Sequence, residues 1–327
     1  MRDSSASVPG PSRQSEDDAA PRTVGPASGE IRQGTLPDSE IGSLVEAMRG
    51  GEPWRVALAR LPLPELQRKP YWFTDAEKAR FYRDLPVAER GHALDIGAGS
   101  GVIAAALASD FRQVVALEHD RVWCEFMERR FHEDGLSNVL VRNAGAPPVP
   151  YPADSFDLVV VNGVLEWVPE SAPLTQSPRE AQVAFLREVR RVLRPGGAVG
   201  VAIENRMFIE NFLGGAPHGE TPFVVILPRP LADLIHRRRT GRPYRTWIYG
   251  PAGYSALFRA AGFSSVEINQ VLPSYHEPRR VVALEDAQAA FESLGGRNPL
   301  KRTFLEVGRR LGFLGRFVHS FYLSARK

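Results

Sequence analysis

The chain has a single cysteine, Cys124, and no long apolar run. One thiol excludes a disulfide within the chain and is typical of a protein from the reducing cytosol. No stretch approaches the roughly 20 apolar residues that cross a bilayer. The polar N-terminus also lacks the apolar centre of a secretion signal. These absences predict a cytoplasmic protein without a membrane span.

Aromatic residues are absent from the first 50 positions, and residues 1–40 are rich in Ser, Pro, Asp and Gly. Such a segment buries too little apolar surface to offset its ordering entropy, so we expect a disordered tail over residues 1–40. Apolar residues recur at helical spacing from Ile41, which predicts an N-terminal helical extension over residues 41–90. Residues 91–327 are expected to form the main domain.

Strong charge and several catalytic motifs are also missing. The formal charge of +3 is too small to indicate a nucleic-acid partner by itself. The densest basic run is His236–Arg239, with Arg242 and Arg245 after it, and it is either a solvated loop or helix end, or a contact for an anionic group. No Gly-x-Ser-x-Gly elbow, Walker lysine or metal-ligand spacing occurs, so no bound metal is expected.

The most informative stretch is residues 92–104. Its apolar run up to Ile96 predicts a buried strand, three glycines then alternate with other residues, and a second apolar run, Val102–Leu107, predicts a helix. A strand, a Gly-rich turn and a helix start form a corner where backbone amides can touch a nucleotide. A dinucleotide fingerprint would need glycine where Val102 stands, which disfavours a nicotinamide-dependent dehydrogenase.

Further strand-like segments alternate with helical ones along the chain, which is typical of an α/β protein. Two segments of weak periodicity, about 204–250 and 276–312, are predicted as insertions, and the second contains two helical patterns. Helix starts are expected at Asp120 and at Ser177, where a proline and a glutamate complete a capping pattern. The other predicted strands are Val114–Glu118, Val139–Val141, Phe156–Val161, Ala198–Ile203, Ser264–Val271 and Phe317–Ala325.

Three motifs resemble one protein family. The Asp-x-Gly-x-Gly-x-Gly pattern from Asp95 to Gly101 resembles the first motif of class I S-adenosylmethionine (SAM) methyltransferases. The runs Ser-Phe-Asp-Leu-Val-Val and Phe-Leu-Arg-Glu-Val-Arg-Arg-Val-Leu-Arg-Pro-Gly-Gly, which begin at Ser155 and Phe185, resemble two later regions of that family. The resemblance covers residues 92–275 and extends to the final strand.

The resemblance implies a Rossmann-like, doubly wound sheet of seven strands with helices on both faces and two inserted segments. In this family the last strand is antiparallel and lies beside the fifth. Residues 204–215 and 271–280 further resemble a subgroup linked to bacterial surface-polysaccharide and glycoconjugate genes.

The resemblance also implies SAM as cofactor and a site for it. The glycine turn would hold the methionine half, and Glu118 would accept both ribose hydroxyls. Asn143 stands where the family usually has aspartate, and its carbonyl oxygen would accept a hydrogen bond from the adenine amino group. Asn162 and Gly163 would border the methionine side. The predicted cofactor residues are Asp95, Gly97, Ala98, Gly99, Gly101, Glu118, His119, Asn143, Ala144, Asn162 and Gly163.

The expected reaction is methyl transfer to a small molecule or sugar, with oxygen as the favoured acceptor atom. A hydroxyl acceptor needs a base, for which Glu166, His218 and His276 are candidates, although each could equally be an ordinary loop or helix-start residue. Two alternatives remain: an RNA or protein methyltransferase that uses a patch from Arg237 to Arg245, and a non-catalytic SAM-binding protein.

Overall fold

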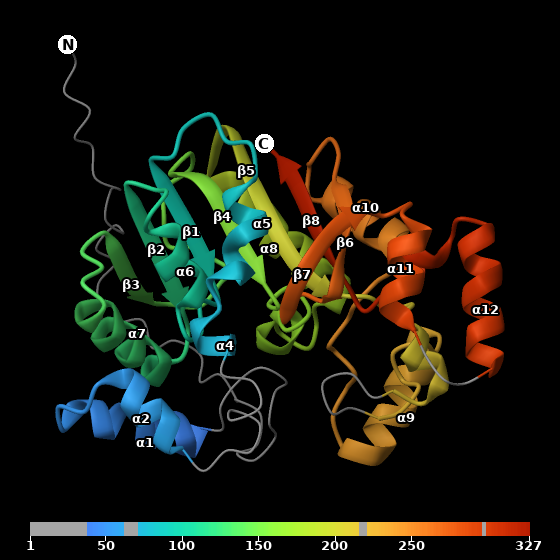
Figure 1. Ribbon diagram of the computed structural model, residues 1–327, viewed down its shortest axis with the longest axis horizontal. Coiled ribbons are helices and arrows are strands. Elements are labelled where there is room, and N and C mark those ends of the chain that lie inside the picture. The colour runs from blue at the N-terminus through green and yellow to red at the C-terminus, as the bar shows by residue number, and fades with distance from the viewer. Residues whose placement is uncertain (1–37, 62–70, 216–220, 296–298) are drawn as a thin grey trace.

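The computed structural model describes residues 38–61, 71–215, 221–295 and 299–327 (Figure 1). The predicted tail, residues 1–40, lies outside this part of the chain except for its last residues, which begin the first helix at Asp38.

A mixed sheet of eight strands forms the centre of the described residues, in the order β3-β2-β1-β4-β5-β8-β6-β7. Strands β1 to β5 are parallel, and β8 lies antiparallel between β5 and β6. The Rossmann-like prediction with its antiparallel last strand is therefore confirmed. The strands are β1 (His92–Ile96), β2 (Gln113–Glu118), β3 (Val139–Asn143), β4 (Phe156–Asn162), β5 (Leu193–Glu204), β6 (Glu267–Ser274), β7 (Glu277–Ala283) and β8 (Ser320–Arg326).

The prediction of seven strands was wrong by one. Strand β7 lies in the segment 276–312, where only helices were expected, and pairs with β6 alone across a hairpin. Its residues are mostly exposed or half-buried and include Pro278, Arg279 and Arg280. An edge strand of this kind has little of the apolar alternation that marks a strand in sequence.

Helices cover both faces of the sheet. Alternate side chains of one strand therefore belong to different cores: Leu158 and Val160 of β4 face one, and Val159 and Val161 face the other. The helices are α1 (Asp38–Arg49), α2 (Trp54–Arg60), α4 (Tyr71–Thr74), η1 (Ala76–Ala79), α5 (Arg80–Arg83), α6 (Val102–Leu107), α7 (Arg121–Glu133), η2 (Val168–Ser171), α8 (Pro178–Val192), η3 (Ile209–Leu213), α9 (Arg229–Thr240), α10 (Pro251–Ala260), α11 (Ala287–Leu294), α12 (Pro299–Arg310) and η5 (Leu314–Phe317).

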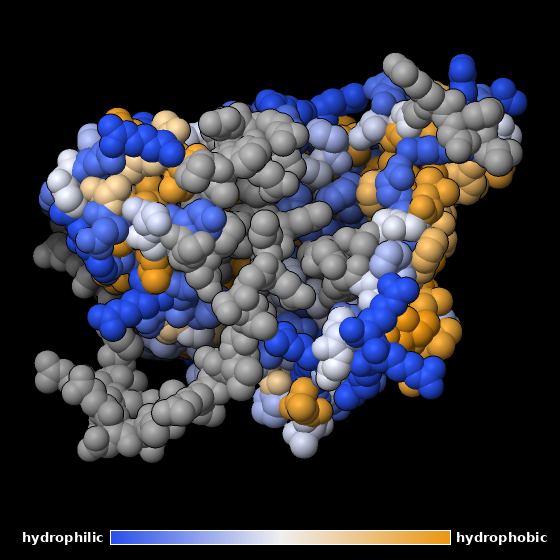
Figure 2. Space-filling view, turned by 90° about the horizontal axis from the view of Figure 1, so that it is seen from below, coloured by the Kyte–Doolittle hydropathy of each residue, from blue (hydrophilic) through white to orange (hydrophobic). Residues whose placement is uncertain are grey.

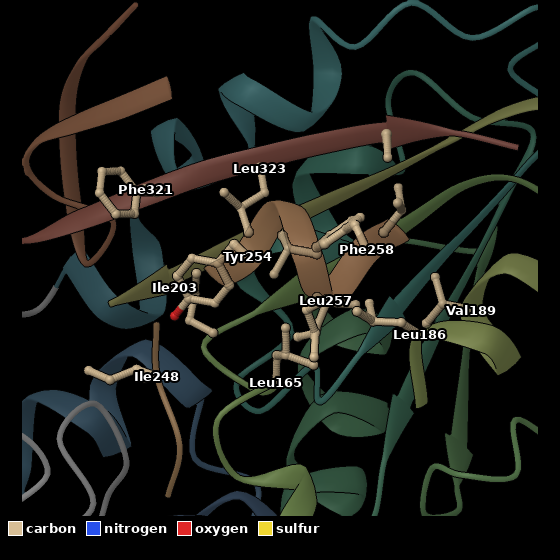
Figure 3. Packing of buried hydrophobic residues seen from close by; sticks show 14 of the residues in the cluster. Leu165, Leu186, Val189, Ile203, Ile248, Tyr254, Leu257, Phe258, Phe321 and Leu323 are labelled. Atoms are coloured by element: carbon tan, nitrogen blue, oxygen red, sulfur yellow. The ribbon is translucent and has the colours of Figure 1, made fainter. Parts of the chain in front are cut away.

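One of these cores joins α8 and α10 to the middle of the sheet. In Figure 3, Leu257 and Phe258 of α10 lie between Leu186 of α8 and Leu323 of β8. All four side chains are fully buried. At about 1.5–3 kcal/mol for each buried side chain of this size, this packing is a main source of stability for the central strands.

The predicted helix starts are confirmed. The Asp120 side chain accepts a hydrogen bond from the Val122 amide at 2.7 Å. At α8, Ser177 and Glu180 form the reciprocal capping box, with proline at the first helical position.

Helices α1, α2 and α4, which precede β1, pack against α7. The Trp54 indole donates to Asp134 Oδ1 at 3.1 Å, and the Arg130 guanidinium lies 4.5 Å from the centroid of the Trp54 ring. Phe73 stacks on Trp123 with ring centroids 5.8 Å apart. These helices thus cover the outer side of α7.

In Figure 1, α9 of the first insertion lies below the sheet at the lower right, whereas the second insertion adds β7 to the edge of the sheet and places α11 and α12 to the right of it. The segment 204–250 contains η3 and α9, and the segment 276–312 contains β7, α11 and α12. No helix within the described ranges is both long enough and apolar enough to cross a membrane.

We predict that Gly200→Ala destabilises the protein by about 1–3 kcal/mol, because overpacking a filled core is unfavourable. A Cβ at Gly200 would lie 2.5 Å from Cδ1 of Tyr82, which is 1% exposed. Urea unfolding measures the change. As a control, Gly42→Ala in α1 adds its Cβ to open space and should leave the protein equally stable or more stable. Equal stability of wild type and Gly200→Ala would contradict the packing described.

Candidate functional site

The turn after β1 is the centre of the candidate site. The amides of Gly97 and Ala98 donate to the Leu117 carbonyl of β2 at 2.8 and 3.2 Å, and Gly101 caps the start of α6. Gly97, Gly99 and Gly101 all have φ between +51° and +73°, which glycine adopts without strain.

The three glycines differ in what surrounds them. A Cβ at Gly97 would lie 2.4 Å from a methyl group of Val164, and one at Gly101 would lie 2.5 Å from the Phe131 ring. A Cβ at Gly99 would meet no atom of the described residues within 4 Å. Gly97 and Gly101 are therefore required by packing, whereas Gly99 borders open space that a ligand can occupy.

Glu118 ends β2 beside this turn and is 5% exposed. The Gly99 amide donates to its Oε2 at 3.0 Å, and the His119 and Asp120 amides donate to its Oε1 at 2.8 and 3.1 Å. Burial raises the pKa of this carboxyl group, but the His119 ring and the backbone amides outweigh burial, and its pKa lies below the ordinary value. Glu118 is thus an ionised acceptor at neutral pH.

Asn143 at the end of β3 closes the same edge. Its side-chain nitrogen donates to the Glu118 and His119 carbonyls at 3.1 and 2.9 Å. The next amide, that of Ala144, also donates to the Glu118 carbonyl, at 3.0 Å. Since these two bonds and a third, to Cys124 Sγ at 3.5 Å, all use the amide nitrogen, the carbonyl oxygen is the atom that can accept from a ligand.

Asp95 lies within β1 and is 1% exposed. Burial raises its pKa from 3.8 to about 7, the nearby Glu118 charge acts in the same direction, and a hydrogen bond from the Ala104 amide opposes them. Its Oδ2 has no hydrogen-bond partner among the described residues. A cationic group bound at the turn would favour the ionised form of Asp95.

Asn162 and Gly163 lie where β4 ends. The Tyr82 hydroxyl donates to Asn162 Oδ1 at 2.9 Å, and Gly163 has φ of +67°. A Cβ at Gly163 would lie 2.8 Å from the Tyr275 hydroxyl oxygen. Gly163 thus lets the turn after β6 approach the end of β4.

That approach brings a group of ionisable side chains to the ends of β4 and β5. The Tyr275 hydroxyl donates to Glu204 Oε1 at 2.9 Å, and His276 Nε2 lies 3.8 Å from the same oxygen. The His276 ring lies 6.1 Å from that of His319. Glu166 is completely buried. Burial raises the pKa of Tyr275 well above its ordinary value, and the negative charges of Glu204 and Glu166 raise it further.

Two of the three predicted base candidates, Glu166 and His276, belong to this group, and His218 lies outside the described residues. Glu204, Tyr275 and His319 were not predicted. Glu204 could have been found, because it is the first acidic residue after the apolar run of the fifth strand, at the edge where such sheets bind ligands. Tyr275 gave no comparable signal, since its place depends on the register of β6 against β8.

The basic run is divided in the structure. His236–Arg239 form the last turns of α9, as one of the two interpretations predicted. Arg245, in contrast, is 6% exposed and donates to the carbonyls of Pro169 and Gln176. Arg245 therefore cannot contribute to a basic surface patch from Arg237 to Arg245, because its side chain is buried and hydrogen-bonded to the loop around η2.

Comparison with known proteins points to one activity. Residues 94–201, from β1 into β5, match the model of a methyltransferase domain family. A "probable S-adenosylmethionine-dependent methyltransferase" of Mycolicibacterium smegmatis is 26% identical over 233 residues, covering 69% of this chain and 73% of that protein. A protein of Mycobacterium tuberculosis with the same description is 29% identical over 145 residues, covering 44% of this chain and 47% of that protein.

A third relative is a demethylmenaquinone methyltransferase of Clavibacter sepedonicus. It is 36% identical over 179 residues, covering 53% of this chain and 66% of that protein. The chain therefore spans less than half of the M. tuberculosis relative and about two thirds of this one.

The buried Asp95 predicts a pH dependence of stability. With its pKa raised to about 7, the folded protein keeps a proton that the unfolded chain releases near pH 3.8. This contribution to stability is present at low pH and is lost as pH rises from about 4 to about 7, by a few kcal/mol. Asp95→Asn, which cannot ionise, should flatten this part of the stability profile in urea unfolding. The same loss in both proteins would show that another group is responsible.

Proposed function

The chain is a class I SAM-dependent methyltransferase, and we propose that the turn Gly97–Gly101 with Glu118 and Asn143 holds its cofactor. The space at Gly99 is the observation that carries this proposal, since among the described residues the turn leaves room for a ligand at Gly99 but not at Gly97 or Gly101. These residues fit SAM. The ionised carboxylate of Glu118 suits the ribose hydroxyls, and the amide carbonyl of Asn143 suits the adenine amino group. The glycine backbone of the turn lets the methionine chain lie close to it.

The individual roles follow from these positions. Glu118 accepts the ribose hydroxyls at Oε2, which also accepts from the Gly99 amide, since its Oε1 is taken by the His119 and Asp120 amides and the His119 ring. His119 and Ala144 flank the carboxylate. The Asn143 carbonyl oxygen accepts from the adenine amino group. Asp95 and Ala98 lie on the methionine side of the turn, and its cationic ammonium group would keep Asp95 ionised. Asn162 and Gly163 border the same side.

SAM supplies a methyl group on a sulfonium that is already activated for displacement. The chain must therefore orient an acceptor in line with the bond that breaks, and such positioning can contribute about 7–11 kcal/mol. We place the acceptor at the ends of β4 and β5, next to His276, whose Nε2 lies 3.8 Å from Glu204 Oε1.

Glu204 and His276 are the proposed proton acceptors for a hydroxyl substrate. Tyr275 stays protonated, since its pKa is well above 10, and it holds the Glu204 carboxylate in place. A base in this position removes the hydroxyl proton as the methyl group arrives, which typically accelerates the step about 10²–10⁴-fold. Glu166 and His218 remain further candidates for the base.

A small-molecule acceptor is supported by the relative that is named for a quinone substrate. Oxygen as the acceptor atom, a sugar as the acceptor, a link to surface polysaccharides and a cytoplasmic location stay predictions. The alternative of an RNA or protein substrate is weakened because Arg245 is not on the proposed patch.

The cofactor site is tested by titration calorimetry with SAM. Gly99→Val fills the open space and Glu118→Ala removes the ribose acceptor, so each should weaken binding by at least about tenfold. Gly135→Val is the matched control, because Gly135 also has a positive φ of +71° and open space but lies at the end of α7. Unchanged affinity in both site variants would refute the cofactor site.

The proton acceptors are tested by methyl transfer from labelled SAM into a cell extract. Glu204→Gln and His276→Gln should each lower the rate by about 10²–10⁴-fold with cofactor affinity unchanged, because the base acts on the acceptor alone. Glu267→Gln, an exposed residue of β6, serves as the control. Full activity in both site variants would place the base elsewhere, and absence of S-adenosylhomocysteine from the wild type would indicate a non-catalytic protein.

A further inference from the structure

Exposed apolar side chains concentrate on the two insertions. Phe212 and Leu213 of η3 are 43% and 60% exposed, and Phe223 is 45% exposed. Phe304 and Val307 of α12 and Leu311, the residue after it, are 37%, 47% and 70% exposed and recur at the spacing of one helix face. We call these six residues the insertion surface.

The two insertions meet at this surface. The Phe317 ring lies 6.4 Å from Phe212 and 5.3 Å from Phe304, so one ring contacts both η3 and α12. Lys301 of α12 also forms an ion pair of 2.5 Å with Glu210 of η3. η3 and α12 are therefore neighbours although they are about ninety residues apart in the chain.

Figure 2 views the molecule from the side where the parallel strands end. It shows hydrophobic residues gathered at the right, the end of the molecule to which η3, α9 and α12 belong, with hydrophilic residues next to them. Monomeric proteins rarely expose apolar groups in this way unless the surface binds something.

The helices at this end are strongly basic. α12 carries four Lys or Arg residues and one acid, and α9 has the same balance. Their combined positive charge exceeds the +3 of the whole chain, so the remainder of the protein is net negative. Arg238 and Arg239 of α9 and Arg302 of α12 are exposed.

We propose that the insertion surface docks on an anionic phospholipid bilayer, with its apolar side chains among the acyl chains and the arginines at the headgroups. Exposed Phe, Leu and Val flanked by Arg match this chemistry. Protein hot spots are enriched in Trp, Tyr and Arg and poor in Leu and Val, whereas the insertion surface consists of Phe, Leu and Val and has no Trp or Tyr. A polyanion such as RNA would use the arginines but not the aliphatic groups.

Docking would bring the bilayer to the end of the molecule that carries α9 and α12, beside the β6–β7 hairpin on which Tyr275 and His276 lie (Figure 1). An acceptor dissolved in the membrane could then enter without crossing water. The docking itself does not depend on the proposed methyl transfer, because it requires no cofactor and no acceptor.

The contribution of the apolar side chains to bilayer binding is tested by sedimentation of the full chain with phosphatidylcholine vesicles that contain phosphatidylglycerol. Val307→Ser combined with Leu311→Ser should weaken vesicle binding by at least about tenfold, since two inserted side chains are lost. Val56→Ser is the matched control, because Val56 is 45% exposed on α2, at the opposite end of the molecule, and should leave binding unchanged.

The contribution of the arginines to bilayer binding is tested with the same vesicles and with vesicles of phosphatidylcholine alone. Arg238→Gln combined with Arg239→Gln should weaken binding to anionic vesicles by at least about tenfold, and neutral vesicles should bind the wild type far less. Arg259→Gln, an exposed arginine of α10, should have no effect.

Three results would overturn the proposal. Wild type that stays in solution with anionic vesicles would exclude a bilayer. A dimer that dissociates in the Val307→Ser, Leu311→Ser variant, without vesicle binding, would make the surface an interface between copies of the chain. Binding to RNA that depends on the arginines but not on Val307 and Leu311 would assign the surface to a nucleic acid.

Discussion

Two backbone positions without room for a side chain hold the candidate site together. Gly97 at the end of β1 lies against Val164, and Gly163 at the end of β4 lies against the Tyr275 hydroxyl. These close approaches place the turn after β1, the end of β4 and the hairpin after β6 next to one another. The proposed cofactor and acceptor positions are neighbours only because both glycines lack a Cβ.

The Tyr275–Glu204 hydrogen bond extends this arrangement to β5. Because the antiparallel strand β8 lies between β5 and β6, the turn after β6 folds back over the ends of the parallel strands. The family's extra antiparallel strand thus has a consequence for chemistry here: it positions His276 and Tyr275 over the carboxylate of Glu204.

The parts of this protein that sequence predicted well are those determined by neighbouring residues. The turn from Gly97 to Gly101, the cap at Asp120 and the box at Ser177 each depend on a few consecutive side chains and a known backbone geometry. The resemblance to a family supplied the doubly wound sheet and the place of the last strand, antiparallel beside the fifth, which alternation alone did not determine.

The parts that sequence missed depend on distant partners. Strand β7 forms because its backbone pairs with that of β6, and its own residues are too polar for the sequence to predict a strand. Arg245 belongs to a basic run in sequence, yet in the fold it satisfies the carbonyls of a loop some seventy residues earlier. Glu204 and Tyr275 meet only through the register of three strands.

The central claim is that the space above Gly99, beside Glu118, is the place of the methyl donor. A crystal structure of the full chain with S-adenosylhomocysteine tests this most directly. The account predicts ribose hydroxyls within hydrogen-bond distance of the Glu118 carboxylate and the amino-acid end of the ligand over the turn beside Asp95. Ligand density anywhere else, with the turn after β1 in contact only with solvent, would contradict it.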